Sequence, residues 1–223
     1  MRSKPRDDPG WDAPDAVALP LGRSRAGYRA AKRAMDVLAS VLGLVLVSPI
    51  LAVAALAVRL TSPGPVLFRQ VRVGQHGRPF EILKFRSMRT GMTGPSVTPG
   101  GDARVTTVGR LLRRSKVDEL PQLWNVLVGD MSLVGPRPEV RKFVELFRAD
   151  YARILSVRPG ITDYAAVDYR DEEALLAGSP DPEAAYAEVV LPAKIKLYHR
   201  YLDDMSLKTD VALILRTLAA LIR

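Results

Sequence analysis

The chain has 223 residues, and its 33 lysines and arginines against 24 acidic residues give a formal net charge of +9 at pH 7. This excess favours an anionic partner, such as a nucleic acid, an anionic lipid or a phosphorylated substrate. The sequence contains no cysteine, which excludes disulfides, thiolate nucleophiles and cysteine-based metal sites. The length suits a single domain with appendages.

Residues 1–28 contain four prolines among scattered charges and show no apolar periodicity. Such a composition does not supply enough apolar surface for a packed core, so we expect a flexible N-terminal extension. A secretion signal is not expected, because the apolar stretch begins only near residue 37 and no small-residue cleavage site precedes Pro49.

An uncharged apolar run of 22 residues, Val37–Val58, follows the extension. A straight helix of that length, at about 1.5 Å per residue, would cross a hydrocarbon core of ~30 Å. Pro49 removes a backbone donor in the middle, so we expect a break at Ser48-Pro49, with the Ser48 hydroxyl bonding a freed carbonyl. Basic residues flank both ends, so positive charge gives no orientation across a membrane. These features favour a re-entrant helix-break-helix over residues 29–60; a kinked full span and a buried hairpin remain the alternatives.

Residues 61–223 show patterns of a mainly helical α+β domain. Alternation in Val66–Val73 and Phe80–Phe85, around the turn Gly74–Gly77, predicts an antiparallel hairpin. Helical patterns follow in five segments: Arg104–Arg114, Glu119–Val128, Val140–Ser156, Pro182–Tyr201 and Leu207–Ile222. The last segment places its apolar side chains on one stripe, which fits an interfacial amphipathic helix lying on a membrane or, equally, a helix packed on the core.

The adjacent carboxylates Asp118 and Glu119 are the candidate chemical groups. If Ser115 capped the following helix, Pro121 would fall inside it, where its missing N–H matters. With Asp118 as the N-cap, Pro121 falls within the first turn, so we expect this second arrangement. The helix dipole and nearby cations would then keep Asp118 ionised, and a divalent cation could be shared with Glu119. A plain helix cap and a catalytic pair both remain open at this point.

Several cations lie near this pair in the sequence. Pro136 and Pro138 stiffen the backbone on both sides of Arg137, which suits a guanidinium held for bidentate phosphate recognition. Lys84, at the end of the predicted hairpin, is a weaker candidate. A surface turn is the alternative for Arg137.

With these residues in view, the chain resembles the bacterial sugar transferase family, the monotopic polyprenyl-phosphate phosphoglycosyl transferases, from about Arg29 to its C-terminus. The segments that carry the resemblance are Lys32-Arg-Ala-Met-Asp36, Ser48-Pro49, Gly64-Pro-Val66, Lys84-Phe-Arg-Ser-Met88, Asp118-Glu-Leu-Pro-Gln-Leu-Trp-Asn-Val126, Gly129-Asp-Met-Ser-Leu-Val-Gly-Pro-Arg-Pro138 and Arg158-Pro-Gly-Ile-Thr162.

The resemblance implies a re-entrant membrane helix broken at Ser48-Pro49 and a catalytic domain on the cytosolic face of the bacterial cytoplasmic membrane. It implies transfer of a sugar phosphate from a UDP-sugar to polyprenyl phosphate, with release of UMP. By motif, Asp118 corresponds to the nucleophile, with Glu119 beside it and Mg²⁺ as cofactor. Arg113 and Arg137 match positions that contact phosphate, and Lys84 is a weaker match.

One segment departs from the family pattern. Many members follow the Pro-Gly-Ile-Thr turn with a Gly-Trp-Ala-Gln-Val type sequence, whereas this chain has Asp163-Tyr-Ala-Ala-Val-Asp-Tyr-Arg-Asp171. If that loop contacts the sugar or the nucleotide, we expect a donor that differs from the commonest ones. The rival hypotheses are a catalytically silent membrane scaffold that binds polyprenyl phosphate, which an intact Asp118, Glu119 and Arg137 disfavour, and a nucleic-acid-binding protein. No ladder of alternating aromatic and basic residues supports a nucleic-acid partner.

Overall fold

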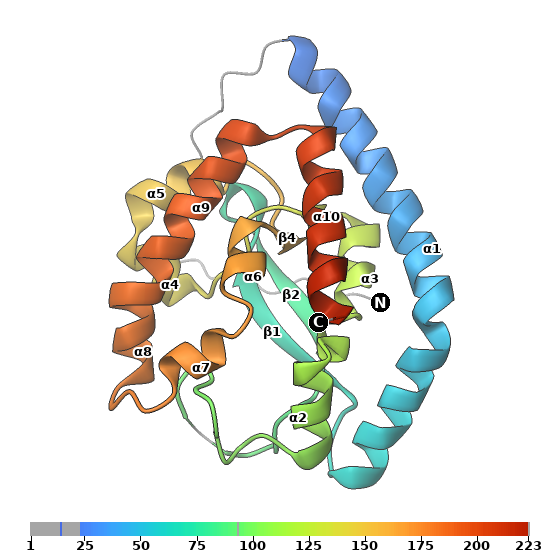
Figure 1. Cartoon of the computed structure of the whole chain (residues 1–223), viewed down its shortest axis with the longest axis vertical. Helices are drawn as coiled ribbons and strands as arrows, with labels where there is room; N and C mark the ends of the chain where they lie inside the picture. The colour runs from blue at the N-terminus through green and yellow to red at the C-terminus, as the bar shows by residue number, and fades with distance from the viewer. Residues whose placement is uncertain (1–13, 15–22, 93, 223) are drawn as a thin grey trace.

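The computed structural model describes residue 14, residues 23–92 and residues 94–222. Most of the predicted flexible extension therefore lies outside the described residues. Helices dominate the described part, and two small sheets lie among them (Figure 1). The expected class, mainly helical α+β, is confirmed at this level.

Helix α1 (Arg23–Thr61) runs as a curved rod along one side of the molecule (Figure 1). The predicted break at Ser48-Pro49 is wrong as an interruption, because the helix continues through Pro49. The reason is a local substitute for the lost hydrogen bond: the Ser48 hydroxyl donates to the Val45 carbonyl at 2.8 Å. Val45 is the residue four positions before Pro49, so this is the carbonyl that the proline nitrogen leaves without its helical donor.

The predicted hairpin is confirmed. Strand β1 (Leu67–Val73) pairs antiparallel with β2 (Pro79–Phe85), with Leu67 opposite Phe85. A short turn, η1 (Gln75–Gly77), joins them.

A second sheet, which the sequence analysis did not predict, pairs β3 (Ser132–Val134) with β4 (Gly160–Thr162) in parallel. Three residues per strand are too few to show alternation. The backbones also meet closely just beyond this pair, since a Cβ at Gly160 would lie 2.1 Å from the Gly135 nitrogen.

Most of the remaining helices follow the predicted segments with shifted ends, but α6 and α7 lie between residues 164 and 176, where no helix was predicted. The segment predicted over 140–156 is divided at Phe147, and the C-terminal helix α10 (Leu207–Ile222) has the predicted bounds. The other elements are α2 (Thr107–Arg114), η2 (Val117–Glu119), α3 (Gln122–Val128), α4 (Arg141–Leu146), α5 (Arg148–Ile154), α6 (Tyr164–Asp168), α7 (Glu172–Leu176), α8 (Pro182–Ala185), the π-helical turn η3 (Tyr186–Val190) and α9 (Leu191–Asp204).

Polar residues near the start of α1 fasten it to the domain. The Asp36 carboxylate accepts hydrogen bonds from the Ser132 hydroxyl (3.1 Å) and the Leu133 N–H (3.0 Å). Arg33 donates to the last carbonyls of α3, with 2.7 Å to Val126 O. Lys32 forms an ion pair with the buried Asp210 of α10 at 3.0 Å.

The far end of α1 packs on the same domain. Ala54 and Val58 form a small core with Phe85 of β2 and Leu112 of α2. The main core lies on the other side of the hairpin, between α4, α5, α9, α10 and β3. Both ends of α1 are therefore attached to one body.

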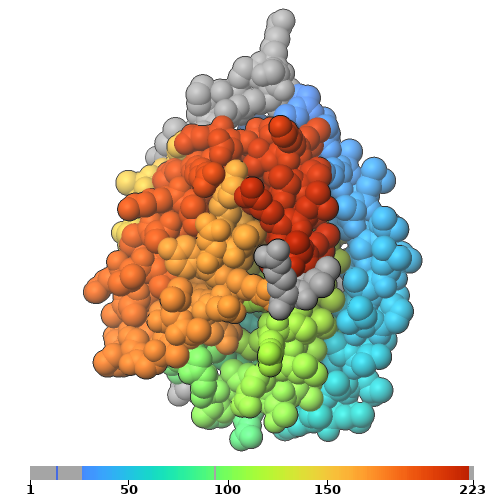
Figure 2. Space-filling view, viewed as in Figure 1, coloured from blue at the N-terminus to red at the C-terminus, as the bar shows by residue number. Residues whose placement is uncertain are grey.

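The outer face of α1 is apolar and exposed, and α1 forms one edge of the molecule from end to end in Figure 2. Its exposed large side chains are Leu38, Val41, Leu42, Val45, Leu46, Ile50, Val53, Leu56 and Leu60. We call this set the outer face of α1. Among the described residues, α1 is the one helix whose length and composition would permit it to cross a membrane.

Helix α10 combines the two arrangements expected for it. Asp210 and Leu213 are buried against the domain, whereas Leu207, Val211, Leu215 and Leu218 are exposed. One side of α10 therefore packs on the core, as one alternative predicted. The other side carries an exposed apolar stripe.

Candidate active site

A cavity of about 870 Å³ lies between the end of the hairpin, the α2–α3 connection, the segment before α4, and helices α6 and α9. All five predicted site residues, Lys84, Arg113, Asp118, Glu119 and Arg137, line it. Basic residues outnumber acidic ones along its wall. The structure therefore brings together the groups that the sequence analysis singled out.

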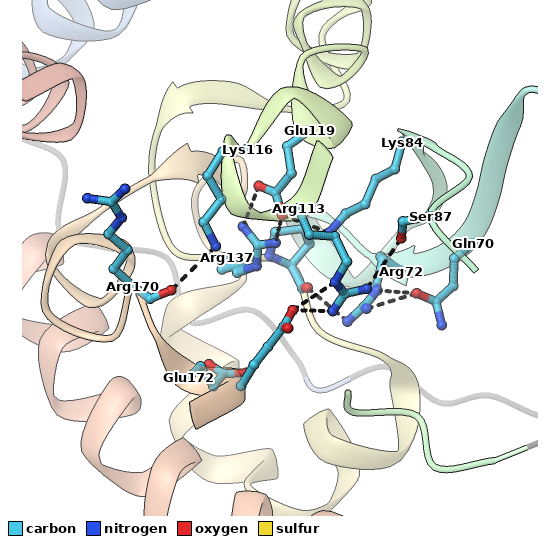
Figure 3. Close-up of polar contacts among 12 residues, drawn as sticks. Gln70, Arg72, Lys84, Ser87, Arg113, Lys116, Glu119, Arg137, Arg170 and Glu172 are labelled. Carbon is cyan, nitrogen blue, oxygen red and sulfur yellow. Dashed lines mark hydrogen bonds and ion pairs between the residues drawn. The ribbon is translucent and has the colours of Figure 1, made fainter. Parts of the chain in front are cut away.

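Glu119 is held between two cations. Lys84 Nζ lies 2.8 Å from Glu119 Oε1. Arg137 donates from both terminal nitrogens, one to each carboxylate oxygen, with 3.1 Å from Nη1 to Oε2. Figure 3 shows Arg137 and Lys84 converging on Glu119. The paired contact of Arg137 is the fork geometry that a planar guanidinium offers to a carboxylate or a phosphate.

The charges in this cluster set the protonation of its members. Burial alone would raise the pKa of Glu119, but Arg137 and Lys84 outweigh it and hold that pKa well below its usual value. Burial lowers the pKa of Lys84, and Glu119 opposes the change. The negative charge of Glu119 raises the pKa of Arg137. Glu119 is therefore an anion paired with cations.

Asp118 lies in the turn η2, not at the start of α3, so its predicted role as an N-cap is wrong. Helix α3 begins at Gln122 after Pro121, with no side-chain cap. Ser115 belongs to the end of α2, where its hydroxyl donates to Leu111 O at 2.9 Å, and Lys116 stops that helix with a φ of 56°. The Ser-x-x-Asp pattern at residues 115–118, which resembles the start of a helix, therefore lies at the end of one, α2.

Because Asp118 lies in η2 and not at the N-terminus of α3, its surroundings also differ from those of the helix end that was expected. Its side chain is buried, and among the described residues Oδ1 has no hydrogen-bond partner. Burial, followed by the charge of Glu119, raises the pKa of Asp118, although Lys84, Arg113 and Lys116 oppose this. No α-helix begins at Asp118, so the helix dipole that was expected to lower its pKa is missing there, whereas the expected effect of the nearby cations Arg113 and Lys116 is present. What remains is a desolvated carboxyl whose free oxygen has cations nearby.

Arg113 reaches the cavity from α2 but is not part of the Glu119 cluster. It pairs with Glu173 of α7, with 2.8 Å from Nε to Oε1, and its Nη1 lies 3.4 Å from the Ser87 hydroxyl. Figure 3 labels Arg113 and Ser87 beside the cluster. A phosphate that binds Arg113 must therefore compete with Glu173.

Arg86 is a cavity residue that the sequence analysis did not select, although it lies in the quoted segment Lys84-Phe-Arg-Ser-Met88. Its buried guanidinium donates from Nη2 to the Ser62 carbonyl at 2.7 Å, just after α1 ends. Gly64 makes room for it, because a Cβ there would lie 2.4 Å from Arg86 Nη1. Arg86 thus connects the end of α1 with the cavity.

Asp118 and Glu119 are the carboxylates that could hold a Mg²⁺ ion in this cavity. Among the described residues, no three acidic or histidine side chains converge on one point. Mg²⁺ usually keeps several waters and takes one or two protein carboxylates plus substrate phosphates, so a full protein cage is not required. The free Oδ1 of Asp118 fits that mode. Both oxygens of Glu119 are paired with Lys84 and Arg137, so Glu119 would have to leave one of these cations to join Asp118.

The segment that departs from the family pattern also reaches the cavity. Asp163, Ala165, Ala166, Val167, Tyr169 and Arg170 belong to its wall. Asp163 follows β4 and caps α6, since its Oδ1 accepts a hydrogen bond from the Ala166 N–H at 2.6 Å. The departure from the pattern thus lies in a segment that can contact a ligand.

Comparison with known sequences gives consistent matches. The profile of the family described as bacterial sugar transferase matches residues 27–223. A protein of Caulobacter vibrioides named UDP-glucose:undecaprenyl-phosphate glucose-1-phosphate transferase is 43% identical over 208 residues, which cover 91% of this chain and 73% of that protein. An Aeromonas hydrophila protein named UDP-N-acetylgalactosamine-undecaprenyl-phosphate N-acetylgalactosaminephosphotransferase is 40% identical over 202 residues, 87% of this chain and 44% of its own length. The exopolysaccharide production protein PSS of Rhizobium leguminosarum is 36% identical over 85% of this chain and 94% of its own.

Proposed function

Because this chain belongs to the bacterial sugar transferase family, we propose that it transfers a sugar phosphate from a UDP-sugar to polyprenyl phosphate, such as undecaprenyl phosphate, and releases UMP. The relatives' names place such a reaction on UDP-sugars and undecaprenyl phosphate. In this chain the reaction would initiate the synthesis of a bacterial surface polysaccharide or glycoconjugate.

The observation that carries the proposal is the cavity beside an apolar helix. A buried carboxyl with a free oxygen lies in a wall rich in cations. The end of α1, whose outer face is apolar, reaches the same cavity through the contact of Ser62 with Arg86. A water-soluble diphosphate and a lipid-linked phosphate can thus meet at one carboxylate.

The chemistry follows from these groups. The Asp118 carboxylate attacks the sugar-linked phosphorus of the UDP-sugar, the bond from that phosphorus to the oxygen bridging the two phosphates breaks, and UMP leaves with that oxygen. An oxygen of polyprenyl phosphate then attacks the phosphorus of the acyl phosphate and displaces Asp118. Two displacements at one phosphorus replace a direct encounter of two anions.

The surrounding residues would bind and orient the diphosphate. Arg137 would offer a fork to phosphate oxygens and Lys84 a point charge, but a phosphate that binds either cation must first displace Glu119 from it. Arg113 becomes available when a phosphate displaces Glu173. Mg²⁺, held by Asp118 and Glu119, would neutralise charge on the diphosphate.

The test is Asp118→Asn. We expect it to lower UMP release from UDP-sugars, in the presence of polyprenyl phosphate and Mg²⁺, by at least about 10³-fold, because an amide cannot act as the nucleophile. Asp203→Asn, whose exposed carboxylate on α9 lies outside the cavity, is the matched control. Both variants should still sediment with membranes. Turnover by Asp118→Asn close to that of the unaltered protein would remove Asp118 as the nucleophile.

We also propose that both ends of α1 lie on the cytosolic face of the cytoplasmic membrane, so that this curved helix is re-entrant without a break at Pro49. The apolar outer face of α1 would then lie in the lipid, with the exposed stripe of α10 at the lipid surface. The support is that Lys32 and Asp36 near one end of α1, and Ala54 and Val58 near the other, contact one domain. A span with its ends on opposite faces would have to break one of these contacts.

The chain offers a clean topological test because it has no cysteine. In separate variants, Ala30→Cys and Thr61→Cys place an exposed thiol near each end of α1. We expect an impermeant maleimide to label both from the cytosolic side only. Labelling of the two positions from opposite sides would establish a full span instead.

A further inference from the structure

A polar part of the cavity wall lies next to Arg137 but outside the Asp118–Glu119 cluster. It contains Asp163 from the start of α6, and Tyr198 and Lys194 from α9. Lys194 is satisfied, because its Nζ lies 2.7 Å from Glu172 Oε2 and 3.2 Å from the Tyr186 hydroxyl. Asp163 and Tyr198 differ from it in this respect.

Two polar atoms of this wall lack a hydrogen-bond partner among the described residues. They are Oδ2 of Asp163 and the hydroxyl of Tyr198. Both residues are buried, with 1% of Asp163 and 0% of Tyr198 exposed. A buried polar atom without a partner costs about 1–3 kcal/mol, and native proteins satisfy nearly all such atoms. Both residues line the cavity, and a molecule in it could supply the missing partners once neighbouring side chains move aside, because neither atom is open to solvent in this structure.

The two groups are electrostatically linked to each other and to the phosphate-binding cluster. After burial, the charge of Asp163 is the largest cause that raises the pKa of Tyr198. Arg137 acts on Asp163 through both its charge and its backbone N–H. The same Arg137 holds Glu119 with its guanidinium. Asp163 and Tyr198 line the same cavity as Arg137, next to the cations where a diphosphate would bind.

We propose that Asp163 Oδ2 and the Tyr198 hydroxyl form a subsite for the ring hydroxyls of the nucleotide-sugar donor. This inference rests on the proposed function. A carboxylate oxygen accepts from a sugar hydroxyl, and a tyrosine hydroxyl can donate to or accept from its neighbour. Such a pair would distinguish sugars by whether a given ring hydroxyl is axial or equatorial. A nucleotide-sugar carries two sets of ring hydroxyls, on the transferred sugar and on the ribose, and the experiment separates them.

The variants are chosen to spare the fold. Asp163→Asn keeps an oxygen to cap α6 and replaces the free oxygen by an NH₂ donor. Asp181→Asn is its control, because Asp181 caps α8 through Glu183 N and Ala184 N at 3.0 Å and lies outside the cavity.

Tyr198→Phe removes the second free group. Tyr151→Phe is its control, since Tyr151 also carries a buried hydroxyl without a partner among the described residues but does not line the 870 Å³ cavity. Both substitutions delete the same atom from a buried ring.

The measurement is kcat/KM for UMP release with UDP-glucose, UDP-galactose, UDP-N-acetylglucosamine and UDP-N-acetylgalactosamine, together with inhibition by UMP and 2′-deoxy-UMP. If the subsite reads the transferred sugar, Asp163→Asn and Tyr198→Phe change the ratios of kcat/KM between donors by at least about tenfold, because an unmatched buried polar group penalises the wrong substrate strongly. If it reads the ribose, all donors lose equally and the preference for UMP over its deoxy analogue shrinks.

Either result supports the subsite and identifies its ligand. Unchanged donor ratios together with unchanged inhibition, at any level of thermal stability, would overturn it and leave Asp163 and Tyr198 as core residues. That outcome is separate from failure of the proposed function, which would appear as no UMP release by the unaltered protein with any donor and would overturn both.

Discussion

The cavity around Glu119 and the outer face of α1 reverse the usual distribution of polar and apolar groups in a folded domain, each in its own way. The cavity buries charge: Asp118 and Glu119 lie among cations, and an oxygen of Asp118 lacks a partner among the described residues. The outer face of α1 exposes apolar side chains along most of the helix. Buried polar groups and exposed apolar surfaces both cost free energy in water.

The two regions therefore require different partners to offset these costs. An unpaired buried carboxyl among cations suits an anionic, metal-associated ligand that replaces its lost hydration. An exposed apolar helix face suits lipid, where it loses its contact with water. The following predictions test whether the two regions depend on separate partners in this way, in order of decreasing effect.

Arg137→Lys tests whether the cavity relies on fork geometry or on charge alone. Lysine keeps the positive charge but offers one donor point where Arg137 offers two nitrogens to Glu119. We expect kcat/KM for UMP release to fall by about 10²–10³-fold, the size seen when one positioned donor is removed from a developing anion. Arg110→Lys on the exposed side of α2 is the control. A change of less than twofold in Arg137→Lys would show that charge suffices.

The buried Asp163 predicts a pH dependence of stability. Burial raises its pKa to about 6, against ~3.9 for a free aspartate. The folded protein holds this proton more tightly, so the contribution is fully present below about pH 4 and is lost as the pH rises through about 6. Between pH 4 and 7, the free energy of unfolding should therefore fall relative to that of Asp163→Asn by up to about 3 kcal/mol. Chemical denaturation in detergent measures this; parallel pH curves would contradict it.

Leu46→Asp tests the other region. Leu46 is 67% exposed on the outer face of α1, and Leu146 on α4 is 62% exposed elsewhere. An aspartate within a lipid-embedded helix costs about 2.5–3.5 kcal/mol, so Leu46→Asp should lower partition into liposomes by about 100-fold. Leu146→Asp should leave it unchanged. Equal sedimentation of both variants with liposomes would show that the outer face of α1 does not enter lipid.

Glu173→Gln should have the smallest effect. Glu173 occupies Arg113, but its side chain is 46% exposed, so solvent screens the pair and its net contribution is below about 1 kcal/mol. Freeing Arg113 should lower the KM for the UDP-sugar by less than about fivefold and leave membrane binding as it was. A higher KM would mean that Glu173 helps to hold the donor.

The sequence predicted those parts of the fold that have a local cause. The alternation around Gly74–Gly77 predicted the hairpin, and apolar periodicity predicted α10 with its bounds. The parallel pair β3–β4 was missed, because its strands are short and 28 positions apart in the register Ser132↔Gly160. The break at Pro49 was also wrong, although the Ser48 hydrogen bond expected there is present and supports a continuous helix.

For the site, the sequence alone determined which residue types were available: an Asp-Glu pair, an arginine between prolines, and a lysine at the end of a hairpin. The tertiary structure decided which partners these residues have and how far they are buried. Glu119 gains its partners from positions 35 and 18 residues away, and Arg113 is paired across 60 residues. Burial turned Asp118 from an expected helix cap into a desolvated carboxyl. The physical reason is that periodicity and turn chemistry act between near neighbours, whereas desolvation and ion pairing depend on groups that only the folded chain brings together.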